Sequence, residues 1–408
     1  MEVKSGYKQT EVGVIPQEWD TTSLEAVCAP GGLVRGPFGG SLKKEIFVSS
    51  GKKVYEQRNA IYRDAGIGSY FIDESRYKEL QRFAVSPGEF IVSCAGTIGR
   101  IFRIPVEAQS GVINQALLKL RTDGEVVDSD FFYHYFDWER FQRRIIDNTH
   151  GGAMQNLVGM DLFRSVEFPL PSLPEQRAIA TALSDVDGLL GGLERLIAKK
   201  RDLKQAAMQQ LLTGQTRLPG FHAEWEVKRL GTLLQFQVGF PFSSAFFNEK
   251  GEGIRLVKNR DLKSDDQVFH YNGMYEEAFV IRDGDVLIGM DGDFLPCQWN
   301  KGPALLNQRV GRVVPNTGLN VAFAFYALIE PLKEIEIVTS CTTVKHLSHG
   351  DVEGIERPLP PLPEQTAIAS VLTEMDGELA ALEQRREKTR ALKQAMMQEL
   401  LTGKTRLI

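Results

Sequence analysis

Apolar side chains recur at alternating spacings of four and three residues along two long segments of the chain. This is the spacing of the a and d positions of a coiled coil, where one apolar stripe faces a partner helix. The pattern predicts two long helices that pack along a shared seam. The expected seam residues are Ile179, Leu183, Val186, Leu190, Leu193 and Ile197 in the first helix, and Ile368, Leu372, Met375, Leu379 and Leu382 in the second.

The two helical segments are copies of each other. Leu-Pro-Ser-Leu-Pro-Glu-Gln at 170–176 returns as Leu-Pro-Pro-Leu-Pro-Glu-Gln at 359–365, an offset of 189 that holds without a gap to Leu-Leu-Thr-Gly at 211–214 and 400–403. Pro174 and Pro363 suit a first helical turn, and Gly214 and Gly403 suit the residue after a helix. A gapless internal copy of this length determines the architecture before any local motif does.

The segments that flank the helices predict how the helices are arranged. The sequence up to Trp225, after the first helix, is similar to the sequence up to Trp19 near the N-terminus. The chain stops at Arg406-Leu407-Ile408, where such a continuation would begin. We therefore expect a circular repeat with pseudo-twofold symmetry, in which residue 1 lies near residue 408. Antiparallel helices with a globular body at each end satisfy this most simply.

Each body combines short strands, turns and a helical stretch, which predicts a mixed α+β (α/β) fold. The expected domains are a first body at 1–170, a central helix at 171–218, a second body at 219–359 and a C-terminal helix at 360–408. Several features recur in both bodies in the same order. They are Pro37-Phe38-Gly39-Gly40 and Pro241-Phe242-Ser243-Ser244, Arg58-Asn59 and Lys258-Asn259, Pro87-Gly88 and Asp283-Gly284, Asn114-Gln115 and Asn307-Gln308, and 153–157 and 343–347. A shared scaffold with different loops suits two domains that recognise different sequences.

Composition narrows the class of protein. The 408 residues are 42% hydrophobic, which is ample for several cores, and the net charge of −5 argues only mildly against a nucleic-acid partner because binding faces are local. Residues 30–110 hold 12 Lys+Arg against 8 Asp+Glu. The four cysteines form no C-x-x-C pair, which suggests free thiols in a reducing cytoplasm. No apolar run approaches the roughly 18 residues of a membrane span.

The doubled Leu-Pro-x-Leu-Pro-Glu-Gln sequence, the paired helices and the Thr-Gly helix ends resemble the specificity (S) subunit of Type I restriction-modification systems. The resemblance covers essentially the whole chain. It implies two target recognition domains, each contacting one half of a split DNA target, and an antiparallel helical spacer between them. It also implies a non-catalytic subunit without cofactors of its own, which binds two methyltransferase subunits and serves motor-nuclease subunits. S-adenosylmethionine, ATP and Mg²⁺ are then expected on those partners.

Two features depart from a strict repeat of this family's pattern. Gly191-Gly192 in the first helix stands where the second has Ala380-Ala381. In the second body, Asp291-Gly-Asp-Phe-Leu295 replaces the Gly96-Thr-Ile-Gly99 turn of the first, so the two bodies need not present this turn to DNA alike.

The sequence does not contain the motifs expected of a catalytic subunit. An amino-methyltransferase needs Asn/Asp-Pro-Pro-aromatic, and no Asn or Asp precedes a proline here. Gly403-Lys404-Thr405 imitates the end of a phosphate-binding loop but is better explained as a helix cap. Asp283, Asp285, Asp291 and Asp293 could hold a divalent cation, although turn chemistry explains Asp-Gly pairs well. We therefore expect neither a catalytic centre nor a metal site.

Arg, Lys, Asn and Gln are the side chains best suited to contact DNA phosphates and base edges. We expect Phe38 and Phe242 to be core residues rather than base-stacking groups. The candidate DNA contacts are Arg35, Lys43, Lys44, Arg58, Asn59, Arg63, His150 and Gln155 in the first body, and Lys258, Asn259, Arg260, Lys263, Lys345 and His346 in the second.

Two inverted, unlike bodies predict a split, non-palindromic DNA target, with halves about one helical turn (~34 Å) apart. Off the seam, Leu189, Leu196, Leu203 and Leu211 offer apolar surface on which methyltransferase subunits could dock. Two alternatives stay open: a related subunit of another methyltransferase-linked phage-defence system, and a scaffold whose bodies bind protein. Salt-dependent DNA binding would exclude the scaffold. The absence of an Asn/Asp-Pro-Pro-aromatic motif argues against a third alternative, a fused methyltransferase.

Overall fold

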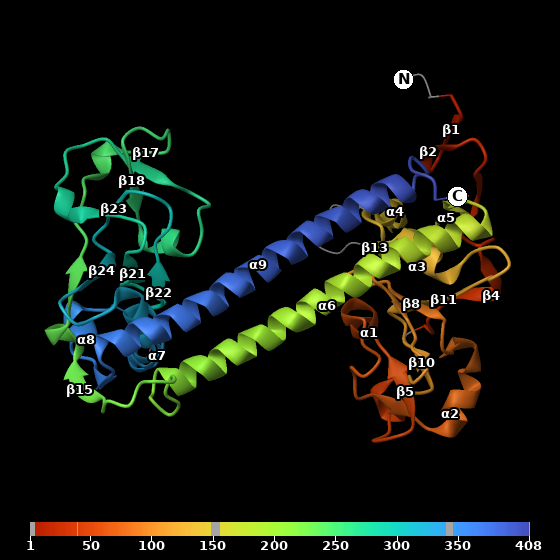
Figure 1. The fold of residues 1–408 in the computed structure, drawn as a ribbon. Coiled ribbons are helices and arrows are strands. Elements are labelled where there is room, and N and C mark those ends of the chain that lie inside the picture. The colour runs from red at the N-terminus through yellow and green to blue at the C-terminus, as the bar shows by residue number, and fades with distance from the viewer. Residues whose placement is uncertain (1–4, 39, 148–155, 340–345, 408) are drawn as a thin grey trace. The chain divides into compact units, whose positions relative to one another are not determined.

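The computed structural model describes residues 5–38, 40–147, 156–339 and 346–407. Contacts divide the chain into unit 1, Met1–Leu193 with Arg385–Ile408, and unit 2, Glu194–Gln384. Each unit contains one body, here called head 1 (the described part of 1–170) or head 2 (the described part of 219–359), and a part of both long helices (Figure 1). The mixed α+β fold expected from the sequence is confirmed.

Head 1 is built on two four-stranded sheets. The first is antiparallel and has the order β4-β11-β8-β9; the second has the order β6-β5-β10-β7 and contains one parallel pair, β5 and β10. Their bounds are β4 Cys28–Arg35, β5 Lys52–Tyr55, β6 Phe71–Ile72, β7 Ala84–Val85, β8 Phe90–Ser93, β9 Ile101–Arg103, β10 Gly111–Ile113 and β11 Leu117–Thr122.

Head 2 repeats this topology. One sheet has the order β16-β24-β21-β22, and the other has the order β17-β19-β18-β23-β20 with β18 and β23 parallel. Their bounds are β16 Leu234–Val238, β17 Phe247–Asn248, β18 Ile254–Val257, β19 Phe269–Tyr271, β20 Val280–Ile281, β21 Val286–Gly289, β22 Pro296–Gln298, β23 Ala304–Leu306 and β24 Val310–Pro315. The alternation of short apolar strands with Gly- and Asp-containing turns accounts for both pairs of sheets.

Strand register fixes which residues correspond between the heads. Ile113 pairs with Tyr55, and Leu306 pairs with Val257 in the same parallel arrangement. Asn114 therefore corresponds to Asn307, as the sequence predicted. The predicted match of Arg58-Asn59 with Lys258-Asn259 is wrong by two residues, because Arg58 corresponds to Arg260.

The helical parts of the heads differ more than the sheets. Head 1 has α1 Gln57–Tyr62, α2 Glu74–Glu79, α3 Ser129–Asp137, α4 Glu139–Ile145 and α5 Met160–Ser165. Head 2 has one long helix, α7 Val321–Thr339, where head 1 has α3 and α4, and it has the short α8 His349–Glu353. Short strand pairs complete the heads: β1 Tyr7–Thr10 with β2 Gly13–Pro16, β3 Asp20–Ser23 with β14 Glu167–Leu170, β12 Ile146–Asp147 with β13 Asn156–Leu157, and β15 Glu226–Arg229 with β25 Glu356–Leu359.

The two long helices are α6 Leu173–Leu211 and α9 Leu362–Leu400. In unit 1, Lys393 of α9 pairs with Asp187 of α6 at 2.6 Å. In unit 2, Lys204 and Lys200 of α6 pair with Asp376 and Glu378 of α9. In unit 1, Arg406, just after α9, also pairs with Glu175 at the start of α6, so within each unit the residue numbers rise along one segment as they fall along the other. The helices are therefore antiparallel, which confirms the prediction.

The predicted seam is covered along its length. The ends of the helices are embedded in the head cores: Ile179 and Leu183 belong to the core of head 1, and Ile368 and Leu372 to that of head 2. Leu211, which we expected to lie on an exposed face, is also buried in the core of unit 2, so that expectation is wrong. Among the remaining seam residues, Leu193, Ile197 and Leu379 are buried, and Val186, Leu190, Met375 and Leu382 are half-buried.

A matched polar contact closes each unit. The buried carboxylate of Glu175, at the start of α6, accepts hydrogen bonds from Trp19 Nε1 (2.9 Å) and Arg406 Nη2 (2.9 Å). At the start of α9, Glu364 accepts the same bonds from Trp225 Nε1 (3.1 Å) and Arg217 Nη2 (2.6 Å). Both contacts also place negative charge at a helix N-terminus.

These contacts explain the circular repeat. In unit 2, Arg217 and Trp225 lie on one continuous piece of chain, whereas in unit 1 the equivalent Arg406 and Trp19 come from opposite ends of the sequence. Tyr7 Oη donates to the carbonyl of Gly403 at 3.2 Å, and β2 lies beside the end of α9 (Figure 1). The first and last described parts of the chain thus lie together in unit 1, while residues 1 and 408 themselves lie outside the described residues.

Gln176 and Gln365 explain the rest of the Pro-Glu-Gln sequence. Gln176 Oε1 accepts from the backbone N–H of Asp128, just before α3, and Gln365 Oε1 accepts from that of Asn320, just before α7. Each amide therefore ties the start of a long helix to the start of a head helix. None of the helices in the described part of the chain is long and apolar enough to cross a membrane.

Candidate nucleic-acid interface

Three loops and one short helical segment (the start of α1 in head 1, 259–263 in head 2) adjoin one another in each head, and we call them the loop cluster. In head 1 they are 36–38 with 40–43, 57–59, 94–99 and 114–116; in head 2 they are 239–243, 259–263, 290–295 and 307–309. Backbone bonds join them: Cys94 N–H donates to Ala116 O at 2.8 Å, and Met290 N–H donates to Arg309 O at 3.0 Å. Most of the sequence-predicted DNA residues lie on or beside these loops.

Tight backbone approaches position the first loop of each cluster. A Cβ on Gly36 would lie 1.9 Å from Asn114 O, and a Cβ on Gly239 would lie 2.3 Å from Asn307 O. Gly36 N–H donates to Leu117 O, and Gly239 N–H donates to Val310 O. Glycine is required at both positions because any side chain would push the loop off the Asn114 or Asn307 turn.

In head 2, several predicted residues gather around Asp291. Asn259 Nδ2 donates to Asp291 O at 2.7 Å, and His346 Nδ1 lies 3.0 Å from Asp291 Oδ1. Lys263 pairs with Asp293, and Arg309 Nη1 lies 3.4 Å from Asp291 Oδ1. The arrangement presents amide, imidazole and cationic groups together at one surface.

The same ion pairs account for the acidic turn. Asp291 and Asp293 are partnered by cations, and Asp285 by Arg312 at 3.2 Å, while Asp283 accepts from the Gly302 N–H. Within the ranges that the structure describes, no group of three or more His, Cys, Asp or Glu residues is arranged to hold a metal ion. Turn formation and ion pairing thus explain this aspartate cluster.

Lys258 has a different environment from its neighbours. Its Nζ lies 3.1 Å from the centroid of the Phe269 ring and 4.9 Å from that of Phe247. Burial lowers the pKa of Lys258, and the nearby Arg260 acts in the same direction. The ammonium is thus held against aromatic rings, whereas the Arg260 side chain is 53% exposed.

In head 1, Lys43, Lys44 and Arg58 are exposed. Arg35, at the end of β4, is half-buried near the thiol of Cys94. Burial raises the pKa of Cys94 to about 11, and Arg35 opposes this rise. Cys94 is therefore a neutral core thiol, and Arg35 is anchored beside the 94–99 turn.

For two predicted residues of head 1 the structure gives a different role. The Asn59 side chain is fully buried; its Oδ1 accepts from Glu56 N–H at 2.8 Å, and its Nδ2 donates to the carbonyls of Asp64 and Ile67. Arg63 binds Asp137 at 2.7 Å and lies 5.4 Å from the centre of the Tyr133 ring. We withdraw Asn59 as a DNA contact because its hydrogen-bonding groups are used inside the head. Arg63 joins α1 to α3.

Three further candidates, His150, Gln155 and Lys345, lie outside the described residues. The sequence interpretation missed Gln57, which corresponds by register to Asn259, and Arg309. Gln57 Oε1 and Asn259 Oδ1 are both buried without a hydrogen-bond partner among the described residues. The strand register matches Tyr55 with Val257, an offset of 202, and this offset aligns Gln57 with Asn259.

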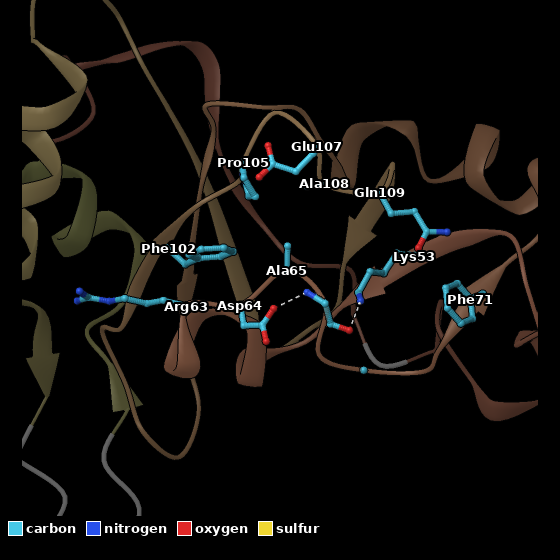
Figure 2. A pocket seen from close by; sticks show the side chains of 12 residues that line it. Lys53, Arg63, Asp64, Ala65, Phe71, Phe102, Pro105, Glu107, Ala108 and Gln109 are labelled. Carbon is cyan, nitrogen blue, oxygen red and sulfur yellow. Dashed lines mark hydrogen bonds between the residues drawn. The ribbon is translucent and has the colours of Figure 1, made fainter. Parts of the chain in front are cut away.

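A hollow of 630 Å³ in head 1 is chemically distinct from the loop cluster (Figure 2). Lys53 Nζ donates to Gly66 O at 3.0 Å, and Asp64 Oδ1 accepts from Gly66 N–H at 2.7 Å. The Arg63 side chain points away from the hollow. Lys53 and Asp64 thus hold the 64–68 loop in place through the backbone of Gly66.

Comparison with known proteins gives a consistent result. The family described as "Type I restriction modification DNA specificity domain" matches residues 16–199 and 222–391. The EcoBI specificity subunit of Escherichia coli is 34% identical over 192 residues, which cover 46% of this chain and 40% of that protein.

Two solved structures share the fold along nearly the full length. The S subunit of a Type I restriction-modification system from M. genitalium has a TM-score of 0.62 at 16% identity and covers 98% of both chains. A chain from a structural study of complex assembly and conformational transition of the type I system has a TM-score of 0.57 at 19% identity, and covers 96% of this chain and 99% of that one.

Proposed function

Because this chain belongs to the family of Type I restriction-modification DNA specificity subunits, we propose that its two heads contact the two halves of a split, asymmetric DNA target. The chain is the DNA specificity subunit of such a system and not its catalytic part. Each half would be recognised by the loop cluster of one head. Cofactors for methyl transfer and DNA translocation would reside on partner subunits.

One observation carries this proposal: two heads of the same topology hold different side chains at corresponding loops. The turn at 94–99 in head 1 contains Gly96 and Thr97, whereas the turn at 290–295 in head 2 contains Asp291 and Asp293. A common scaffold with unlike loops suits recognition of two unlike sequences, since base-edge contacts specify sequence.

The proposed contacts follow from exposure and position. In head 1 they are Lys43, Lys44 and Arg58, with Arg35 beside them. In head 2 they are the exposed Arg260, Lys263 and His346, with the half-buried Asn259 beside them. Exposed lysines and arginines suit phosphates, while Asn and Arg side chains suit adenine and guanine edges in the major groove.

Arg58 and Arg260 offer a matched test, because they correspond by register and both are exposed. In cells that supply the partner methyltransferase, single-molecule sequencing of the wild type should show two short motifs at a fixed spacing. Arg58→Ala should alter recognition of one half only, and Arg260→Ala the other. A lost base contact should cost about 1–3 kcal/mol of discrimination, and a lost phosphate contact should reduce the slope of log K against log[salt] by about 0.9.

A single continuous motif would overturn the split target. The same motif change from both variants would contradict recognition of one half by each head. Phosphate binding releases counterions, so the affinity of the complex for DNA should fall as the salt concentration rises. An affinity that does not depend on salt would contradict all of the proposed phosphate contacts.

The chain works in an assembly with partner subunits, and we propose that methyltransferase subunits dock on the long helices. Leu196 and Leu203 of α6 are 41% and 49% exposed in unit 2, and Leu392 of α9 is 54% exposed in unit 1. Leu189 is exposed as well. Leucines at these positions leave apolar area that the helix pair itself does not cover, and such area favours a protein partner.

Co-expression followed by size-exclusion chromatography with light scattering tests this docking. The wild type should co-migrate with the methyltransferase, and Leu196→Glu with Leu203→Glu should release it without unfolding the chain. Lys333→Glu, on the exposed side of α7, is a control that should leave the complex intact. Co-migration that survives the leucine changes would rule out this surface.

A further inference from the structure

Phe38 is the most exposed aromatic side chain among the described residues, with 89% of its surface accessible. The sequence predicted that it belongs to the core, and this prediction is wrong. Phe242, which the sequence paired with it, is 7% exposed and lies in a core cluster of head 2. Burial of an apolar ring is favourable, and an exposed ring does not gain this free energy. The exposure of Phe38 therefore needs a physical explanation.

The loop around Phe38 is held in place on both sides. Gly36 N–H donates to Leu117 O at 2.9 Å, Pro37 is buried, and Ser41 N–H donates to Phe38 O at 3.0 Å. Proline also fixes its own φ angle. The ring is therefore presented to solvent by an anchored backbone, at low entropic cost for any partner that takes it up.

Head 2 exposes a phenylalanine at the corresponding loop. Gly239 corresponds to Gly36, and the next residue, Phe240, is 43% exposed. Phe240 O accepts from Gln308 N–H at 3.1 Å, which places this loop next to Arg309 and the groups around Asp291. In both heads, an exposed phenylalanine thus adjoins the proposed DNA-contacting groups.

The surroundings of Phe38 favour nucleic acid over an apolar protein surface. The other exposed side chains of its loop cluster are the cationic Lys43 and Arg58 and the neutral, polar Thr97 and Gln115, and the exposed Lys44 follows directly after Lys43. A single ring among cations is the combination that binds stacked bases, because cations hold the phosphates while the aromatic face contacts a base. A protein-docking patch would need contiguous apolar area.

We propose that Phe38 is an apolar wedge that inserts against the bases of the half-site contacted by head 1 and stabilises an unstacked base step. This inference rests on the proposed function. Side chains of this kind open base steps in other DNA-binding proteins. Methyl transfer to a base in a duplex requires that base to leave the stack, so a group that stabilises the opened step would assist the partner enzyme.

The test uses the complex of this chain with its methyltransferase and a duplex that carries the motif methylated by the wild type. Phe38→Ala should weaken binding by about 5- to 150-fold, the range for loss of one base–aromatic contact. The slope of log K against log[salt] should stay unchanged because phenylalanine carries no charge. Phe38→Trp should retain most of the affinity. In contrast, Lys43→Ala should lower that slope by about 0.9 if Lys43 contacts a phosphate.

Fluorescence locates the wedge. With 2-aminopurine placed at successive positions of the half-site, the wild type should raise emission at one step, and Phe38→Ala should abolish this rise. Val106→Ala is the matched control, because Val106 is an 83% exposed apolar residue of head 1 outside the loop cluster. Its chain neighbours Pro105 and Glu107 line the hollow of Figure 2. It should change neither affinity nor emission.

The outcomes separate the two proposals. If the wild-type complex does not bind DNA, the proposed function fails and this inference with it. If the wild type binds and Phe38→Ala binds equally well, only the wedge is excluded. Loss of the methyltransferase from the Phe38→Ala complex, with wild-type affinity after saturation by added methyltransferase, would assign Phe38 to protein docking and overturn the wedge.

Discussion

Heads 1 and 2 have an acid–base pair at the same position of the scaffold, but each head forms it from different residues. In head 1, buried Glu89 lies 3.8 Å from Lys119, whose Nζ donates to Ala84 O at 2.6 Å. In head 2, Asp285 lies 3.2 Å from Arg312, which donates to Val280 O at 3.0 Å. The paired strands place these groups at corresponding positions, so the acid–base pair and its carbonyl acceptor are features of the scaffold.

The loop clusters do not share this correspondence. In head 1, Ser93 Oγ donates to Thr97 O at 2.6 Å and accepts from Arg100 N–H, which holds a neutral turn. In head 2, the corresponding turn is acidic; its carboxylates pair with Lys263 and Arg309, and His346 Nδ1 lies 3.0 Å from Asp291 Oδ1. The difference teaches that sheet register and buried pairs maintain the head, while the chemistry of the loops can change freely around them.

The largest test of this comparison uses Leu183 and Leu372, which occupy equivalent positions on α6 and α9 and are fully buried in the cores of units 1 and 2. Leu183→Ala and Leu372→Ala should each lower the free energy of unfolding by about 2–5 kcal/mol, because each leaves a cavity in a packed core. Hydrogen exchange read by mass spectrometry should show loss of protection in unit 1 for the first variant and in unit 2 for the second. Equal loss in both units for either variant would show that the two cores unfold as one.

A smaller effect is expected at the contacts that close the units. Trp19→Phe removes the donor to Glu175 and should cost about 1–3 kcal/mol, because the lost bond is buried and its acceptor is charged. Trp225→Phe removes the matching bond to Glu364, but Trp225 is only half-buried, so its cost should be smaller. Urea unfolding of both variants measures the difference. A larger cost at Trp225 would contradict the burial argument.

The sequence predicted the long helices, their antiparallel packing and the circular repeat because these depend on regular signals. The apolar period of α6 and α9 and the gapless copy need no knowledge of loops. The structure adds the reason for the Pro-Glu-Gln sequence: Glu175 and Glu364 bind Trp and Arg side chains that a sequence pattern does not connect. Their partners Arg406 and Arg217 share the offset of 189, which was the available signal.

Side-chain roles in the loops were harder to predict because short insertions change the offset between the heads. The offset at Asn59 was taken two residues too short, which hid the match between Asn59 and Asp261. Both accept a hydrogen bond from a backbone N–H three residues earlier, and both are buried. Residue type alone could not separate this buried role from DNA contact. Exposure of Phe38 likewise depends on an anchored loop that no local period encodes.

The smallest expected effect is a pH dependence of stability that His134 gives to head 1 and that head 2 lacks at the corresponding position. His134 of α3 is buried, with Nε2 2.9 Å from Ser184 Oγ, and its counterpart on α7 is Tyr326, whose hydroxyl donates to Asp376 at 2.7 Å. Burial lowers the pKa of His134 below its ordinary 6.5, against an opposing but smaller effect of Asp187. Above about pH 7 the imidazole is neutral in both folded and unfolded chains, so it adds no pH dependence there.

Below that value the unfolded chain takes up a proton that folded head 1 resists, so stability should fall as pH falls from about 7 to 5, by at most about 1.4 kcal/mol for each pH unit. His134→Gln cannot titrate and should remove this part of the pH dependence, whatever it does to stability at pH 7.5. Tyr326→Phe is the matched control in head 2 and should leave the dependence as in the wild type. Urea unfolding at pH 7.5 and 5.5 measures all three chains, and an unchanged pH dependence in His134→Gln would show that the imidazole takes up its proton equally well in the folded head.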